Sequence, residues 1–207
     1  MTKQVDKKHY DFSKYSHVGR WGSYYYQLRE VLNLKLNSIL EVGAGDKVFG
    51  SFIKNNTGIS YTSLDIAEDL KPDVVAPITK TGLSSNSYDV VCAFEVLEHI
   101  PFEEFTIALN ELLRVSKNYV VISVPHFGPP VQFLLKIPFL PYFRFSIKIP
   151  FAKQHTFNGE HYWEVGKKGF PVSRIIQTIE KCGVLEKHFI PFENQYHHFF
   201  IIKKNNG

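Results

Sequence analysis

The chain has 207 residues, of which 44% are hydrophobic and 21% charged, and its formal net charge is +4. This composition is typical of one globular domain with a buried core, and so weak and scattered a charge argues against a nucleic-acid partner. The two cysteines, Cys92 and Cys182, stand far apart and lack a nearby cysteine or histidine pair. We therefore expect no metal site and a reducing, cytoplasmic environment.

In chain order, the first half alternates helices and strands. Helix-forming residues fill 24–36, a short apolar strand covers 38–42, and a helix follows a glycine turn at 48–56. Further strands are expected at 60–64, 73–76, 88–94 and 119–124, with an amphipathic helix at 102–115. This alternation predicts an α/β fold, a doubly wound and mostly parallel Rossmann-like sheet with helices on both faces.

The second half departs from this rhythm. Residues 126–160 form an insertion after the fifth strand, a helix is expected at 173–181, and two strands follow at 184–191 and 196–203. The short connection between these strands favours a hairpin, with an antiparallel strand at or near one edge of the sheet. His197 and His198 would then lie in an edge strand, away from catalysis. We divide the chain into a helical extension (1–36) and a domain (37–207) in which 126–160 is a substrate lid.

Ligands of open parallel sheets bind beyond the carboxyl ends of the strands. The first strand is followed by Gly43-Ala44-Gly45, whose backbone a ligand can approach closely, and the second ends in Asp65. A carboxylate about 20 residues beyond such a turn can bind both hydroxyls of a ribose, and the alternative is a capping carboxylate. A dinucleotide turn would need glycine or alanine at the position of Val48, so a nicotinamide dehydrogenase is disfavoured.

Four segments together resemble a known family. They are SILEVGAGD, YTSLDI, YDVVCAFEVLEHIP and LNELLRVSKNYVVISVP, in order over residues 38–125. They are similar to the successive motifs of class I S-adenosylmethionine-dependent methyltransferases, and most similar to small-molecule enzymes related to the ubiquinone and menaquinone methyltransferases. The resemblance implies a seven-stranded sheet closed by a C-terminal antiparallel hairpin. It also implies methyl transfer to a small acceptor, and the aromatic residues in and around the insertion 126–160 indicate an apolar or glycan-linked one.

The resemblance also implies which residues bind S-adenosyl-L-methionine. These are Glu41, Gly43, Ala44, Gly45, Asp65, Ile66, Ile78 and Phe94. Asp65 would bind the ribose, Ile66 and the backbone near Ile78 the adenine, and the Phe94 carbonyl the methionine ammonium. The sequence departs from the family at Pro77, where an aspartate is common, and at Lys47. The Lys47 side chain is expected either to lean toward the cofactor carboxylate or to point into solvent.

Histidines are the first candidates for a catalytic base, which methyl transfer needs only when the acceptor must lose a proton. His99 and His126 both follow strands that end at the expected site, so we place them first, with a structural hydrogen bond as the alternative role for each. His161 would enter from beside the insertion. The expected site contains no metal ion.

The insertion is expected to determine the acceptor. Its residues 143–149 alternate apolar and polar side chains, as in a strand with one apolar face. The aromatic residues around it suit a lid over the acceptor, a peripheral membrane contact through 131–151, or a flap that buries its own core. The N-terminal stretch 10–28 is also expected to fold over the cofactor, with Arg20 and Tyr24 as candidate contacts.

Two other functions remain open. A nucleic-acid methyltransferase is disfavoured by the scattered charge and by the absence of an Asn-Pro-Pro-Tyr type motif after the fourth strand. A non-catalytic protein that keeps the cofactor fold is the second alternative, since a fold does not guarantee activity. The sequence leaves the methylated atom and the oligomeric state undetermined.

Overall fold

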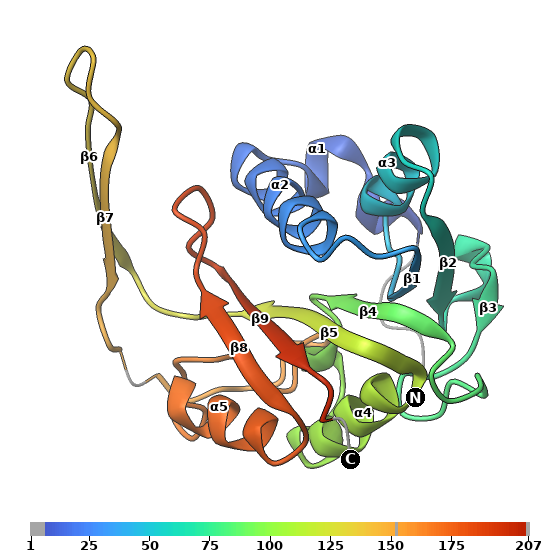
Figure 1. Cartoon of the computed structure of the whole chain (residues 1–207). Helices are drawn as coiled ribbons and strands as arrows, with labels where there is room; N and C mark the ends of the chain where they lie inside the picture. The colour runs from blue at the N-terminus through green and yellow to red at the C-terminus, as the bar shows by residue number, and fades with distance from the viewer. Residues whose placement is uncertain (1–6, 152, 206–207) are drawn as a thin grey trace.

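The computed structural model describes residues 7–151 and 153–205. Its centre is a seven-stranded sheet in the order β3-β2-β1-β4-β5-β9-β8, as Figure 1 shows. Strands β1 to β5 are parallel, and β9 is antiparallel to both of its neighbours. The strands are β1 (Ser38–Val42), β2 (Ser60–Asp65), β3 (Val74–Val75), β4 (Tyr88–Phe94), β5 (Ser116–Pro125), β8 (Val184–Phe189) and β9 (His197–Lys203). The doubly wound fold with a C-terminal antiparallel hairpin is thereby confirmed.

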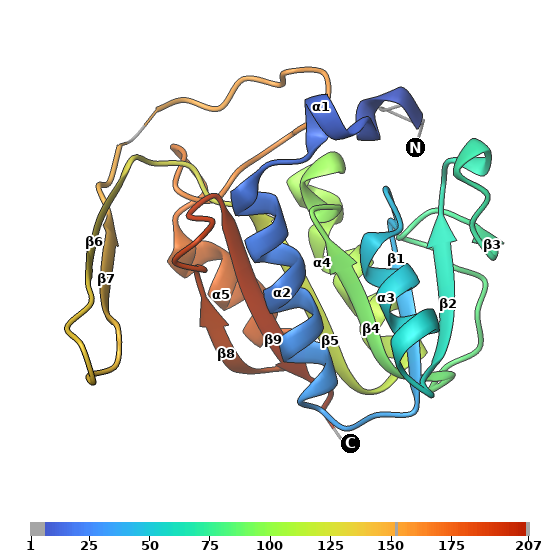
Figure 2. The same ribbon diagram turned by 90° about the horizontal axis from the view of Figure 1, so that it is seen from above.

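Helices cover both faces of the sheet (Figure 1). One face carries α2 (Val18–Leu32) and α3 (Val48–Asn56), and the other carries α4 (Phe102–Val115) and α5 (Val172–Glu180). The short helix α1 (Phe12–Tyr15) lies beyond the carboxyl ends of the parallel strands (Figure 2). Successive residues of a strand point to opposite faces. Accordingly, Leu40 and Val42 of β1 pack in the core beneath α4 and α5, while Ile39 packs in the core beneath α2 and α3. The described residues also form three 3-10 turns: η1 (Lys7–Tyr10), η2 (Glu68–Leu70) and η3 (Leu97–His99).

The order of the last two strands corrects one expectation. β8 is the edge strand, and β9 lies between β5 and β8. His197 and His198 of β9 are therefore buried inside the sheet, 2% and 3% exposed, so placing them in an edge strand was wrong. A hairpin signal in the sequence does not tell which of its two strands pairs with the existing sheet.

The first half of the insertion forms a hairpin of its own. β6 (Pro130–Leu135) pairs with β7 (Phe143–Lys148), and Figures 1 and 2 show the pair extending away from the domain. The register places apolar residues opposite one another on one side, which we call the apolar face of the hairpin: Val131, Phe133, Leu135, Phe143, Phe145 and Ile147. These side chains are 42–59% exposed, so the hairpin does not bury a core of its own.

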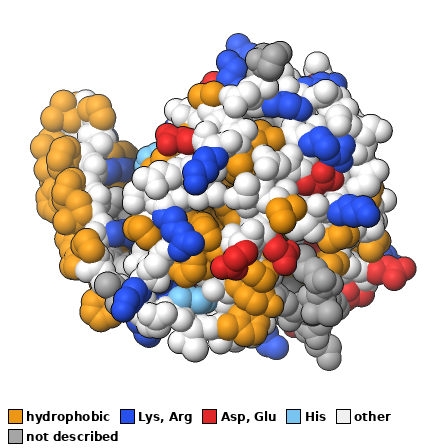
Figure 3. Space-filling model, turned by 90° about the horizontal axis from the view of Figure 1, so that it is seen from below, with side chains coloured by type: hydrophobic (Ala, Val, Ile, Leu, Met, Phe, Trp, Pro, Cys, Tyr) orange, Lys and Arg blue, Asp and Glu red, His pale blue; other side chains and the backbone are white. Residues whose placement is uncertain are grey.

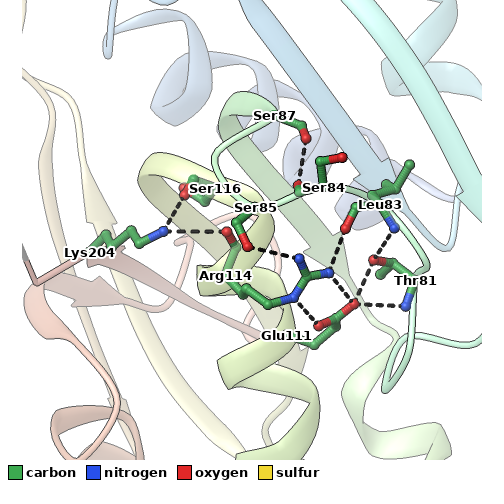
Figure 4. A network of polar contacts seen from close by, with 9 residues as sticks. All are labelled: Thr81, Leu83, Ser84, Ser85, Ser87, Glu111, Arg114, Ser116 and Lys204. Atoms are coloured by element: carbon green, nitrogen blue, oxygen red, sulfur yellow. Dashed lines mark hydrogen bonds and ion pairs between the residues drawn. The ribbon is translucent and has the colours of Figure 1, made fainter.

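A polar network ties α4 to the loop before β4 (Figure 4). The Glu111 carboxylate accepts hydrogen bonds from the backbone and hydroxyl of Thr81, at 2.8 and 2.6 Å, and from Arg114. Arg114 also donates to Ser85, and Lys204 donates to the carbonyl of Ser116. The network lies where β4 and β5 begin, at the opposite end of the sheet from their carboxyl ends, so it supports the fold rather than the site.

Candidate functional site

The turn after β1 has a left-handed backbone conformation at two glycines. Gly43 and Gly45 have φ angles of +75° and +46°, which side chains of other residues rarely adopt. A Cβ on Gly43 would run into the Val96 side chain, and one on Gly45 would touch the ring of Tyr10. Ala44 between them is buried. Both positions thus require glycine, because the φ angle is positive and because a neighbouring side chain lies against the backbone.

A cavity of about 40 Å³ lies between the ends of β1 and β2. Gly43, Asp65, Ile66 and Ile78, four of the residues expected to bind the cofactor, line it together with Val96. The Asp65 carboxylate accepts the backbone N–H of Ala67 at 2.9 Å, and burial raises the pKa of this carboxyl. The structure therefore gathers the expected nucleoside residues at one place.

Pro77 itself is not among the residues that line this cavity, whereas its neighbours Ala76 and Ile78 are. The departure from the family at this position thus leaves an apolar wall rather than a carboxylate. Val96, which the sequence analysis missed, closes the cavity from the loop after β4.

The side chains of Glu41 and Phe94 are both buried, and the contact expected for the Phe94 carbonyl stays a prediction. The Glu41 carboxylate accepts a hydrogen bond from the Tyr61 hydroxyl, and burial raises its pKa to about 8. The Phe94 ring packs between Phe49 and Phe199, with ring centroids 5.3 and 6.2 Å away. Neither side chain is among those that line the cavities described here.

A cavity of about 370 Å³ lies on the other side of the turn, lined by Gly45, Asp46, Lys47, Tyr10 and the loop around η2. The Lys47 ammonium donates to the Lys71 carbonyl at 3.1 Å. Lys47 thus bridges two loops at the edge of this cavity, and its orientation toward a cofactor carboxylate stays a prediction. The Tyr24 hydroxyl donates to Asp46, so one of the two N-terminal candidates contacts the turn.

The N-terminal segment lies beyond the carboxyl ends of the parallel strands, where Figure 2 shows α1. Tyr10 lines both the cavity of about 370 Å³ and a third cavity of about 280 Å³. The segment therefore borders the expected cofactor site, as the sequence indicated for residues 10–28.

We call the third cavity, of about 280 Å³, the histidine cavity; His99, His161, Glu95, Glu98 and Arg20 are among its lining residues. Arg20 donates to the Tyr15 hydroxyl at 2.9 Å, and its guanidinium stacks on the Tyr15 ring at 4.0 Å. Burial raises the pKa of Glu95 to about 7 and lowers that of His99 to about 4. Acidic and imidazole groups with strongly shifted pKa values are common in functional sites.

His126 occupies a different place. Its Nδ1 lies 3.1 Å from Nδ1 of His198 in β9, whose Nε2 lies 3.0 Å from Nδ1 of His188 in β8. The three imidazoles thus form a chain that runs from the end of β5 to β8. Burial lowers the pKa of His126 to about 4. His126 is not among the residues that line the histidine cavity, so the structure does not bring together the two histidines selected from the sequence.

Comparisons with known proteins agree with this architecture. Residues 40–122, less than half of the chain, match the family model described as a methyltransferase domain. No curated protein matches the chain in sequence. This matched stretch begins within β1 and includes the glycine turn, Asp65 and β4, and therefore the residues expected to bind the cofactor.

Solved structures are similar in fold at low identity. The 1,6-didemethyltoxoflavin-N1-methyltransferase of Burkholderia thailandensis, with S-adenosylhomocysteine bound, has a TM-score of 0.64 and 13% identity over 96% of this chain and 83% of its own. The magnesium protoporphyrin IX methyltransferase of Synechocystis, with S-adenosylmethionine bound, has a TM-score of 0.60 and 12% identity over 97% of this chain and 90% of its own.

An S-adenosylmethionine-dependent methyltransferase of Mesorhizobium loti has a TM-score of 0.58 and 14% identity, covering 90% of this chain and 98% of its own. Identities this low establish the fold alone. The chain therefore has the fold of these methyltransferases and, over residues 40–122, the sequence pattern of a methyltransferase domain.

Proposed function

We propose that the protein transfers a methyl group from S-adenosyl-L-methionine to a small acceptor. The observation that carries this proposal is the gathering of Gly43, Asp65, Ile66 and Ile78 at one cavity. This cavity lies beside β1, the strand at which the order of the parallel sheet reverses. Ligands of doubly wound sheets bind at such a reversal.

The nucleoside part of the donor finds partners of suitable chemistry. The Asp65 carboxylate can accept both ribose hydroxyls, and Ile66 and Ile78 offer apolar surface to the adenine. The turn from Gly43 to Gly45 separates this cavity from that of about 370 Å³, so the methionine part would run along the turn. Glu41 would act indirectly, by holding Tyr61 beneath the turn.

The reaction itself needs alignment more than activation. A lone pair of the acceptor attacks the methyl carbon, and the carbon–sulfur bond breaks with both electrons going to sulfur, which leaves neutral S-adenosylhomocysteine. An acceptor hydroxyl or ammonium must also release a proton. Alignment of the two reactants contributes up to about 7–11 kcal/mol to such a step. Of the two histidines named from the sequence, only His99 lines the histidine cavity.

The test is calorimetric titration with S-adenosylmethionine and S-adenosylhomocysteine. Hydrogen bonds to a charged group contribute about 1.5–3 kcal/mol, so Asp65→Ala should weaken binding by about 10- to 150-fold. Glu68→Ala is the matched control, because Glu68 is exposed in the same loop. The absence of binding by the folded wild-type protein would contradict the proposal. Binding without methyl transfer to a broad panel of acceptors would favour the non-catalytic alternative.

We further propose that the protein works at an anionic lipid surface, which its hairpin touches. Figure 3 shows hydrophobic side chains along the outer side of the hairpin. At the tip, Phe139 is fully exposed. Residues 130–151 include Lys136, Arg144 and Lys148 and no acidic residue. An uncovered apolar surface of this kind marks an interaction site, and the exposed Lys136 near the tip suits anionic headgroups.

The opposite side of the hairpin faces the domain. Gln132 donates to the Phe192 carbonyl, Arg144 pairs with Glu193, and Lys148 donates to the His126 carbonyl. These contacts hold the hairpin so that its apolar face points outward. Among the described residues, no helix has the length and apolarity needed to cross a bilayer, so the proposed contact is peripheral. An apolar or lipid-linked acceptor would be accessible from this position.

Sedimentation with vesicles tests the lipid contact. Full burial of a phenylalanine contributes about 1.5–3 kcal/mol, so a double substitution Phe133→Ser and Phe145→Ser should weaken binding to phosphatidylserine vesicles at least about tenfold. Ile107→Ser is the control, because Ile107 is 56% exposed on α4, outside the hairpin. A different result would be a wild-type protein that binds no vesicles but forms dimers, which the double substitution dissociates. That result would show that a second copy of the chain covers the apolar face instead.

The unpaired Cys92 and Cys182 suit a reducing compartment, so a cytoplasmic location is part of the proposal.

A further inference from the structure

Three side chains with metal-binding groups converge in the histidine cavity. Glu98 and His99 belong to η3, directly after β4, and His161 comes from the segment that follows the hairpin. One donor atom from each lies within 4.8 Å of the other two. The fold thus brings together three potential metal ligands from distant parts of the chain. The spacing of the cysteines does not indicate this cluster.

The Glu98 carboxyl group is fully buried, at 0% exposed, and neither of its oxygens has a hydrogen-bond partner within the described part of the chain. The nearest recorded basic atom is Nε2 of His99, at 3.9 Å from Oε1. Glu95 lines the same cavity and also has a buried oxygen without such a partner. Burying carboxylates without compensation is costly, and buried charges in proteins are paired or coordinate metals.

Arg20 is a cation on the cavity wall, and its buried Nε has no hydrogen-bond partner within the described part of the chain. Its terminal nitrogen donates to the Tyr15 hydroxyl, and its plane stacks on the Tyr15 ring. Within the described part of the chain, no ion pair joins Arg20 to the Glu98 carboxylate, whose ion-pair partner is His99. A further positive charge in the cavity would compensate both carboxylates.

Both histidines are oriented as metal ligands usually are. Nδ1 of His99 lies 3.1 Å from the Glu160 carbonyl oxygen, which only accepts hydrogen bonds, so this nitrogen carries the proton and Nε2 the lone pair. Nδ1 of His161 lies 3.3 Å from the Glu164 carboxylate, which fixes the same tautomer. A carbonyl or carboxylate bound to the far nitrogen is the common outer shell of a metal-bound histidine.

We propose that Glu98, His99 and His161 bind one divalent transition-metal ion, with its open coordination positions facing the histidine cavity. Two imidazoles and one carboxylate suit Zn²⁺, Mn²⁺, Fe²⁺ or Co²⁺ better than Mg²⁺ or Ca²⁺, which prefer oxygen ligands. Donor atoms bound to such an ion lie about 3 Å apart, so the three side chains must close by about 1 Å each. In this arrangement His99 holds a cation and does not remove a proton.

Metal binding can be measured without any methyl donor, so its outcome is separate from that of the proposed function. Untagged protein is stripped with a chelator and dialysed against Zn²⁺, Mn²⁺ or Co²⁺, and the bound metal is counted by mass spectrometry. Binding of Co²⁺ also gives visible absorption bands that report the ligand number. We expect one ion per chain, with affinity reduced at least tenfold in Glu98→Gln and in His161→Ala.

Two further variants separate the site from general structural damage. Glu164→Gln should weaken binding by about 10- to 100-fold, because the Glu164 carboxylate, which also pairs with Lys167 at 3.2 Å, orients His161. His17→Asn should bind normally, since His17 lines the same cavity but caps α2, and asparagine caps a helix as well. The proposal is overturned if folded wild-type protein binds none of these ions at millimolar concentration. It is equally overturned if the Glu98 and His161 variants, with melting curves like the wild type, bind as the wild type does.

Discussion

Replacing Gly43 with alanine should destabilise the domain by about 2–5 kcal/mol. The φ angle of +75° costs a residue with a Cβ about 1–2 kcal/mol. The new methyl group would also run into Val96, and overpacking of this kind costs about 1–3 kcal/mol. Gly82 separates these two causes, because its φ of +72° is nearly the same while nothing lies within 4 Å of its Cβ position.

The assay is urea unfolding of Gly43→Ala, Gly82→Ala and Val96→Ala, and of Gly43→Ala combined with Val96→Ala. Gly82→Ala should lose only the conformational part, about 1–2 kcal/mol. The combined variant should be more stable than the sum of its two single changes predicts, because truncated Val96 makes room for the new methyl group. Equal losses at Gly43 and Gly82, or strict additivity in the combined variant, would refute the close contact between the turn and Val96.

Two other predictions concern stability. Burial lowers the folded-state pKa of His126 from 6.5 to about 4, so its contribution is complete above pH 6.5 and is lost as the pH falls toward 4, by about 3 kcal/mol at 1.36 kcal/mol per pH unit. His126→Asn should flatten the pH dependence of urea unfolding in this range, and an unchanged slope would contradict the burial argument. Glu111→Ala should cost about 1–2 kcal/mol in the same assay, because Thr81 and Arg114 lose their shared acceptor. A neutral effect would show that the polar network of Figure 4 does not stabilise the fold.

Much of the sheet was predictable because its strands are buried on both faces. Strands β1 and β4 and helices α3 and α4 have the predicted bounds, since their apolar periodicity is strong. Strand β5 is longer than predicted and runs from Ser116 to Pro125. Its first residues are polar and would favour a loop by themselves, but pairing with the neighbouring strands keeps them extended. Helix α2 begins at Val18, six residues earlier than predicted, since its cap is His17 rather than one of the usual capping residues.

The site was predictable only where it follows the strands. Glycines and Asp65 directly after β1 and β2 could be located from the sequence, because parallel strands bring their carboxyl ends together. The approach of His161 to Glu98, and of Tyr10 to Gly45, depends on how distant segments pack. No pattern in the sequence marks such contacts. The roles of all these residues in binding and catalysis stay predictions.

The most direct test of the account is a crystal structure of the protein with S-adenosylhomocysteine. We predict the ribose hydroxyls on the Asp65 carboxylate, the adenine between Ile66 and Ile78, and the amino-acid part along the backbone from Gly43 to Gly45, with Val96 and Tyr10 displaced to admit it. Electron density for the ligand away from the turn, or ligand contacts that leave Asp65 bound only to the Ala67 backbone, would contradict the central claim.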